Sequence, residues 1–162
     1  MVKIIGYGSV FNILDAQGDI IRKNTFIDSI TKHSKQPYIK FLWQHDVKKP
    51  LGIIKSALED ERGLLIEAVI NTNIGYGNDA AELVKHGAID GFSIGFTLRE
   101  FEYEKNTRVI TKVDLWEVSL VTFPANTAAQ VNYIQLHNAA ATTNHAALHT
   151  KLNLAIHNIQ HR

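Results

Sequence analysis

Apolar and polar residues alternate along most of this chain, which predicts a protein built mainly from β-strands. The alternation is clear in three segments: Ile39 to His45, Phe92 to Tyr103 and Arg108 to Thr122. Shorter or less regular strands are expected from Val2 to Leu14, at Ile20-Ile21, from about Pro50 to Glu59 and from Leu64 to Ile70. Turn-forming residues separate them, at 15–19, 60–63 and 105–107. The first turn predicts a hairpin at the start of the chain.

Two segments change to helical periodicity. Thr25 is placed to cap a short helix from Phe26 to Lys35, and Gly87 is placed to end a second helix within Asn71 to His86. Beyond about residue 135 the composition shifts to Ala, Asn, Thr and His, and one apolar stripe is formed by Leu148, Leu152, Ala155 and Ile159. The expected fold class is mostly β with α (α+β): an antiparallel β-barrel flanked by short helices in residues 1–134, and a helical, polar C-terminal tail in residues 135–162.

Composition narrows the class of protein. The chain has 162 residues, 45% hydrophobic and 20% charged, which suits one globular domain with a single core. A net charge of +1 gives no electrostatic reason to expect a nucleic-acid or membrane partner. The absence of cysteine excludes disulfides, thiolate zinc sites and cysteine nucleophiles, and suits a reducing cytoplasm. We expect no signal peptide, because the first residues lack a long apolar core.

The segment Gly91-Phe92-Ser93-Ile94-Gly95 places a serine between two glycines within an apolar strand. Glycine neighbours leave the hydroxyl open to a bulky substrate, so Ser93 is a candidate nucleophile. The alternative is that Ser93 is a small packing residue where two strands approach closely.

A serine nucleophile needs a base and a group that orients the base. His45 ends one alternating strand and Glu117 lies in another, within Leu115 to Val121. The alternatives are a partly buried histidine bonded to a backbone carbonyl, and a glutamate paired with a lysine or arginine. Asp90 and Asp114 are weaker candidates for the orienting acid, and Ser119 is a rival nucleophile without flanking glycines.

Two other motifs do not lead to a function. Gly-x-Ser-x-Gly also matches the nucleophile elbow of α/β-hydrolases, but an elbow leads into a helix, and here strand alternation continues. The pairs His145/His149 and His157/His161 have the spacing of zinc ligands on a helix, but no carboxylate accompanies them, so a solvated face is expected. No metal or other cofactor is predicted.

Several blocks of residues occur together in a specific order. They are Asp15-x-x-Gly18-Asp19, Leu42-Trp43-Gln44-His45-Asp46, Leu51-Gly52, Gly63-Leu64, Gly87 to Phe96 and Glu117-Val118-Ser119-Leu120-Val121-Thr122-x-Pro124-Ala125-Asn126. The order resembles the prohead (capsid-maturation) protease family of tailed bacteriophages, over about residues 4 to 131. Asn24-Thr25 departs from the family, which usually has glycine and a small residue there, and the tail matches no motif.

The resemblance implies a serine endopeptidase with a fold like the herpesvirus assemblins. By position it implies that Ser93 is the nucleophile, His45 the base and Glu117 the orienting acid. It also implies that the enzyme acts in the host cytoplasm, inside the prohead, on scaffold or the scaffolding segment of the major capsid protein, and on itself.

Further expectations concern substrate binding and assembly. Gly91, Ile94, Gly95 and Arg99 are candidates for substrate or oxyanion binding. Self-association within the shell is also expected. The competing hypotheses are a non-catalytic capsid-assembly or scaffold-binding adaptor on the same fold, and a degenerate prophage copy.

Overall fold

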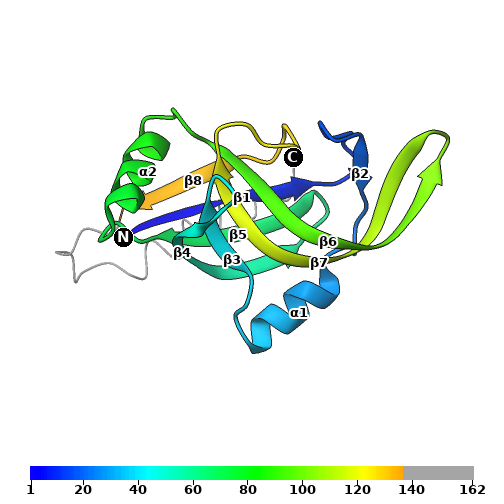
Figure 1. The fold of residues 1–162 in the computed structure, drawn as a ribbon, viewed down its shortest axis with the longest axis horizontal. Helices are drawn as coiled ribbons and strands as arrows, with labels where there is room; N and C mark the ends of the chain where they lie inside the picture. The colour runs from blue at the N-terminus through cyan, green and yellow to red at the C-terminus, as the bar shows by residue number, and fades with distance from the viewer. Residues whose placement is uncertain (137–162) are drawn as a thin grey trace.

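The computed structural model describes residues 1–136 and contains one curved sheet with two helices outside it (Figure 1). The strands are β1 (Val2–Val10), β2 (Asp19–Ile21), β3 (Lys40–Trp43), β4 (Asp46–Glu59), β5 (Gly63–Ile70), β6 (Gly91–Glu104), β7 (Thr107–Val121) and β8 (Val131–Leu136). The helices are α1 (Ile27–Lys35) and α2 (Gly75–Lys85). The prediction of a mostly β protein with two short helices is therefore confirmed.

Strand pairing is mostly antiparallel. The order along the sheet is β2-β7-β3-β4-β5-β1-β8, and β6 pairs with the other edge of β7. Two pairings are parallel, because β2 and β3 both run in the direction of β7. Because β6 pairs along the whole of β7, β6 and β8 are the last strands at the two sides of the sheet. Within the described residues these two strands form no ladder with each other, and the segment before β8 meets β6 through the bridge of Gln130 with Gly91 and the hydrogen bond from Phe92 N–H to the Ala129 carbonyl oxygen. A closed antiparallel barrel is thus not established by the pairing, although the fold has two layers in which β6 and β7 cross in front of β1 and β5 (Figure 1).

The predicted chain reversal at 15–19 is confirmed: Leu14 and Ile20 form an antiparallel bridge, and the N–H groups of Asn12 and Asp15 donate to the carbonyl oxygens of Ile21 and Asp19. The expected pairing of the returning strand with the first strand is wrong beyond this short hairpin, because β2 pairs in parallel with β7. An ion pair holds β2 against β7: Asp19 is buried, and the guanidinium of Arg108 on β7 donates to both its carboxylate oxygens at 2.7 and 2.6 Å. A buried carboxylate needs such a partner, so β2 lies beside β7.

Thr25 does not cap α1, which is a second correction. Its hydroxyl donates to the carbonyl oxygens of Arg22 and Ile110, at 2.6 and 3.1 Å. The carboxylate of Glu59 instead accepts the backbone N–H groups of Asn24 and Phe26 that precede the helix, at 2.6 and 2.7 Å. These N–H groups precede the first turn of α1, so Glu59 fixes the segment that leads into the helix, and no side chain among the described residues caps the helix itself.

The core lies between the two layers of the sheet, with α1 packed on β4 and β7 and α2 on β5 and β4. Its largest fully buried side chains include Tyr7, Phe26, Phe41, Phe92, Leu115 and Leu120. The predicted stop at Gly87 is confirmed by its φ of 69°, which a glycine adopts without strain. Neither helix has the length and hydrophobicity needed to cross a membrane.

The predicted boundary between residues 134 and 135 stays a prediction. β8 extends from Val131 to Leu136 and pairs with β1, a strand that the sequence pattern did not reveal. The helical tail and both histidine pairs, His145/His149 and His157/His161, lie outside the described residues.

Core packing under the serine strand predicts a large stability effect. Phe92 is fully buried and packs edge-to-face on Phe41, with ring centroids 6.3 Å apart. We expect Phe92→Ala to lower the free energy of unfolding by about 3–5 kcal/mol, measured by urea denaturation. Phe123→Ala is the control, because Phe123 is almost fully exposed and its loss should change stability by less than about 0.5 kcal/mol. Equal effects of the two substitutions would contradict this assignment of the core.

Candidate active site

The long hairpin β6–β7 places Ser93 and Glu117 on one face of the sheet. Ser93 is paired with Ser119, and Gly95 with Glu117. A β-carbon added at Gly95 would lie 2.5 Å from Oε1 of Glu117, so the carboxylate covers the side-chain face of Gly95. Residues two apart in a strand share a face, so the Ser93 hydroxyl is on the same side as this carboxylate.

His45 joins them on that face. Its Nδ1 lies 2.6 Å from Oε1 of Glu117. Glu117 itself is buried, with 9% of its surface exposed. The hydrogen bond that His45 donates to Glu117 raises the pKa of His45, and burial lowers it by a smaller amount. A carboxylate held against one ring nitrogen fixes the tautomer and leaves the other nitrogen for proton transfer. The structure thus brings together two of the three predicted residues through a direct contact.

The local conformation of His45 differs from the prediction. It was expected to end a strand, but β3 ends at Trp43, and Gln44 and His45 form a two-residue turn to Asp46 with φ values of 53° and 58°. Two positive φ angles in a two-residue hairpin loop define a type I′ turn, which favours Asn and Gly. Gln44-His45 carries no such signal, so the alternating pattern predicted a strand through His45, two residues past the actual end of β3 at Trp43.

Several hydrogen bonds hold this strained turn against β7. Gln44 N–H donates to the carbonyl oxygen of Leu120 at 3.0 Å, and its side-chain amide donates to Thr122 Oγ1 at 2.9 Å. His45 N–H donates to Ser119 Oγ at 3.1 Å. Because left-handed backbone at non-glycine residues costs free energy, the turn depends on these contacts with its neighbour.

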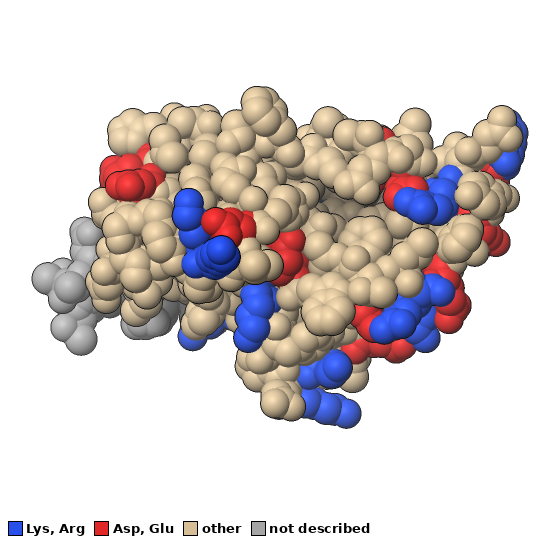
Figure 2. Space-filling model, viewed as in Figure 1, with Lys and Arg blue, Asp and Glu red and all other residues tan. Residues whose placement is uncertain are grey.

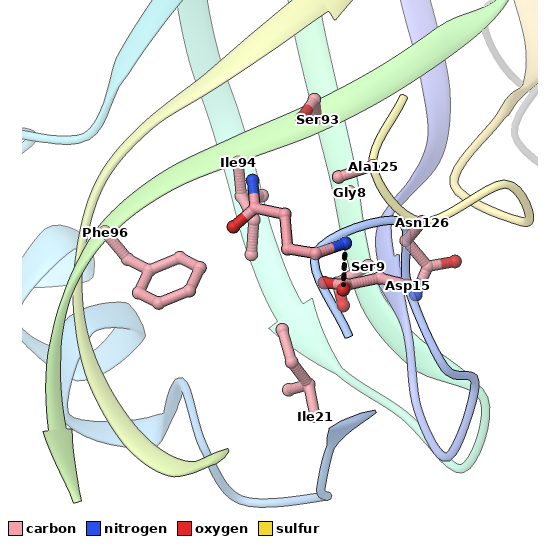
Figure 3. A pocket seen from close by; sticks show the side chains of 10 residues that line it. Gly8, Ser9, Asp15, Ile21, Ser93, Ile94, Phe96, Ala125 and Asn126 are labelled. Carbon is pink, nitrogen blue, oxygen red and sulfur yellow. Dashed lines mark hydrogen bonds between the residues drawn. The ribbon is translucent and has the colours of Figure 1, made fainter. Parts of the chain in front are cut away.

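Ser93 is only 7% exposed and lies at the edge of a cavity of about 30 Å³ (Figure 3). Ile94 and Phe96 project from β6 into this cavity (Figure 3), and Gly8, Ser9 and Ile21 are among the residues on its other sides. A wider groove of about 330 Å³ continues along β6 past Gly95 and Leu98 to Arg108. Within the described residues, no hydrogen bond joins Ser93 Oγ to His45. The two residues nevertheless flank Ser119, whose Cα should lie about 4.5–5.5 Å from that of Ser93.

The other predicted residues are placed as follows. Gly91 packs on the loop after β7, where an added β-carbon would meet Pro124 and the Val121 carbonyl oxygen at 2.8 Å. Arg99 forms an ion pair with Asp114. Arg99 lies six residues beyond Ser93 on β6, which is about 20 Å along a strand. The structure does not bring Arg99 or Asp114 to the histidine. Asp90 immediately precedes β6, and its carbonyl oxygen accepts the N–H of Val131.

Sequence reasoning missed the role of Ser119, which it weighed only as a rival nucleophile. Ser119 is fully buried, and its hydroxyl donates to Oε2 of Glu117 at 2.6 Å. A hydroxyl engaged with a carboxylate and closed to solvent is not placed to attack a substrate. The Glu-x-Ser spacing, which puts both side chains on one strand face, was the available signal.

Charged residues on the face shown in Figure 2 are mixed in sign. Figure 2 shows lysine and arginine side chains beside acidic ones, with uncharged surface between these groups. Among the described residues, Arg22 pairs with Glu104 and Lys112 with Asp28. The surface shown therefore has no single-sign patch of the kind that attracts a polyanion.

The chain is similar in sequence to known phage proteins. The family model described as caudovirus prohead serine protease matches residues 1–145. The chain is 30% identical over 130 residues to the prohead protease of Enterobacteria phage HK97, covering 78% of this chain and 57% of that protein. It is 33% identical over 144 residues to the prohead protease of Escherichia phage T5, covering 85% of this chain and 65% of that protein. The chain thus spans about three-fifths of the length of these two relatives.

Solved structures show a similar fold at low sequence identity. The capsid assembly protease of bacteriophage T4 superposes with a TM-score of 0.53 and 13% identity, covering 74% of this chain and 81% of that one. The KSHV protease, solved with a hexapeptide phosphonate inhibitor, gives a TM-score of 0.53 and 11% identity, covering 95% and 76%. The fold is therefore like that of the phage and herpesvirus proteases.

The contact between His45 and Glu117 predicts a measurable change in pKa. In Glu117→Gln the negative charge is lost and burial remains, so the pKa of His45 should fall below its ordinary value, as measured by NMR titration of the imidazole. An unchanged pKa would contradict the contact.

The same contact makes stability depend on pH. Because the folded-state pKa of His45 is raised, the pair stabilises the fold fully below the unfolded-state pKa, and this contribution is lost as pH rises through the folded-state pKa. In Glu117→Gln this loss should disappear and stability should instead rise with pH over the same range, because the folded-state pKa of His45 then lies below the unfolded-state value.

Proposed function

The chain belongs to the caudovirus prohead serine protease family, and we propose that it is a serine endopeptidase acting in phage capsid maturation, with Ser93 as nucleophile, His45 as base and Glu117 as orienting acid. The single observation that supports it best is the 2.6 Å contact of Glu117 with His45 Nδ1, on the strand face that carries Ser93. A buried carboxylate on the far nitrogen of an imidazole is the arrangement that a serine nucleophile requires.

The proposed substrates follow from the family. We take them to be scaffold, or the scaffolding segment of the major capsid protein, together with the protease itself, and the site of action to be the interior of the prohead in the host cell. The relatives are named as prohead proteases, which supports a role in the capsid precursor.

The proposed reaction is acyl transfer. His45 Nε2 accepts the proton of Ser93 as Oγ attacks the carbonyl carbon of a peptide bond. The carbon–nitrogen bond then breaks, and the leaving amine takes the proton from the imidazolium. Water attacks the acyl-enzyme, again with His45 as base, and Ser93 leaves as a hydroxyl. Throughout, Glu117 stabilises the imidazolium without accepting its proton. The hydrogen bond between Ser93 and His45, which is absent from the described residues, has to form before this first step.

Backbone donors for substrate lie on the free edge of β6. The N–H of Phe92 donates to the carbonyl oxygen of Ala129, on the side away from β7, at 2.9 Å. Ile94 is two residues further on, so its N–H points to the same side, where β6 has no neighbouring strand among the described elements. Gly95 N–H points toward β7 instead. The N–H of Ile94 is therefore the better donor for an oxyanion or an extended substrate, and the N–H of Gly95 is not available to either.

Removal of one hydroxyl tests the assignment. We expect Ser93→Ala to reduce cleavage of co-expressed capsid protein by a factor on the order of 10³ or more, measured by intact mass, with the folded state retained. Ser56→Ala, an exposed serine on β4, is the matched control and should cleave normally. Continued processing by Ser93→Ala would contradict the serine mechanism, whereas an adaptor would process nothing in either form.

A serine-directed phosphonate gives a second test that needs no natural substrate. Ser93 Oγ should displace fluoride from an alkyl fluorophosphonate, with the proton passing to His45, and the adduct should map to Ser93 by peptide mass spectrometry. We expect labelling to be lost in Ser93→Ala and strongly slowed in Glu117→Gln. Equal labelling of several serines would count against an activated nucleophile.

A further inference from the structure

Ser119 links the proposed acid to the backbone of the proposed base. Its hydroxyl donates to Oε2 of Glu117 at 2.6 Å and accepts the backbone N–H of His45 at 3.1 Å. The residue has no exposed surface. A hydroxyl has one proton to donate and lone pairs to accept, so these two bonds use it as both donor and acceptor.

The two oxygens of Glu117 therefore have separate partners. Oε1 contacts His45 Nδ1 and Oε2 accepts from Ser119, so rotation of the carboxylate would break both hydrogen bonds. The opposite side is limited by β6, because the side chain lies across Gly95, where an added β-carbon would be 2.5 Å from Oε1. The carboxylate is thus held between a donor on its own strand and a glycine on the next.

The same hydroxyl also restrains the turn that carries the imidazole. His45 has a φ of 58°, which is unfavourable for a residue with a side chain, and its N–H would otherwise face the interior of the site. The bond to Ser119 satisfies this N–H while the turn keeps its left-handed conformation. Loss of the hydroxyl would leave a carboxylate oxygen and a backbone N–H without their protein partner.

We infer that Ser119 is a positioning residue that fixes the Glu117 carboxylate and the His45 turn in one geometry, and that Gly95 serves the same geometry by leaving room for the carboxylate. This inference rests on the proposed function for its catalytic consequence, but the geometry it describes is measurable without catalysis. Ser119 acts through its neighbours and does not touch the substrate.

The expected kinetic consequence is a loss in the chemical step. Without the Ser119 hydroxyl, Oε1 is free to move away from Nδ1, and fewer molecules hold the imidazole oriented for proton transfer. Residues that orient the ligands of a catalytic metal typically contribute about 10–100-fold to activity, and Ser119 orients a carboxylate in the same way. We expect Ser119→Ala to lower kcat by about that factor and to change KM by less than about 3-fold. Ser119→Thr keeps the hydroxyl on a β-branched side chain suited to a strand and should restore most of kcat.

The charges near the imidazole are few, which simplifies the measurement. Glu117 on β7 is the charged group in contact with the ring. Lys40 on β3 is paired with Glu117 in register but is exposed, and Asp46 on β4 lies 3.9 Å from Lys49. The facing residues of β6, Ser93 and Gly95, carry no charge. A change in the titration of His45 on substitution of Ser119 therefore reports on its contact with Glu117.

The deciding experiment is NMR of the His45 imidazole in the Ser93→Ala background, where self-cleavage does not interfere. We expect the Nδ1-bound proton to give a downfield signal protected from exchange. In Ser119→Ala this signal should broaden or disappear, and the pKa of His45 should move down toward its ordinary value. Ser119→Thr should retain both properties, whereas Gly95→Ala should lose them by displacing the carboxylate.

Ser29→Ala is the matched control. Ser29 is also a buried serine whose hydroxyl makes two bonds to the sheet, donating to the carbonyl oxygen of Val113 at 3.2 Å and accepting the N–H of Leu115 at 2.9 Å. Its loss should lower stability without altering the imidazole. An unchanged His45 signal and pKa in Ser119→Ala, or an equal change in Ser29→Ala, would overturn the inference. Failure of Ser93→Ala to stop cleavage would overturn the proposed function alone.

Discussion

This site depends on one constraint: each oxygen of the buried Glu117 carboxylate needs a hydrogen-bond donor. Glu117 is 9% exposed, and a charge removed from water to that degree destabilises a fold unless hydrogen-bonded groups surround it. Here the partners are an imidazole and a hydroxyl, at 2.6 Å each. Because of this carboxylate, positions 45 and 119 need side chains that donate a hydrogen bond, and position 95 needs a residue without a β-carbon.

The sheet supplies these neighbours because β7 is a central strand. β6 lies along one edge of β7 in antiparallel pairing and brings Ser93 and Gly95. β3 lies along the other edge in parallel pairing, and the turn after it brings His45. The proposed nucleophile and base therefore approach the acid from opposite sides. Strands of a packed sheet hold such positions more rigidly than a surface loop would.

Much of this arrangement could be predicted from sequence because period-two alternation is a direct consequence of strand geometry. It located β6 and β7 within a residue or two and put Ser93 on a face of small residues. The pattern failed where contacts between residues far apart in the sequence determine the local structure. The ion pair of Asp19 with Arg108 holds β2 beside β7, and the hydroxyl of Thr25, the expected cap of α1, is instead bonded to backbone carbonyl oxygens. The turn at Gln44-His45 is held by β7 and contains neither of the residues that normally mark it. No local pattern encodes such contacts.

The parallel pairing of β3 with β7 has a consequence for the order of assembly. Ser93 and Glu117 belong to one hairpin, so their mutual alignment requires only a short closure of the chain. Lys40 is paired with Glu117 across a far longer separation, and such contacts carry a larger entropic cost before they become favourable. We expect acid and nucleophile to be aligned early during folding and the histidine to arrive late. Pulse-labelled hydrogen exchange that protected β3 before β6 would contradict this order. A chain emerging from the ribosome would then remain catalytically inactive until β3 has paired with β7.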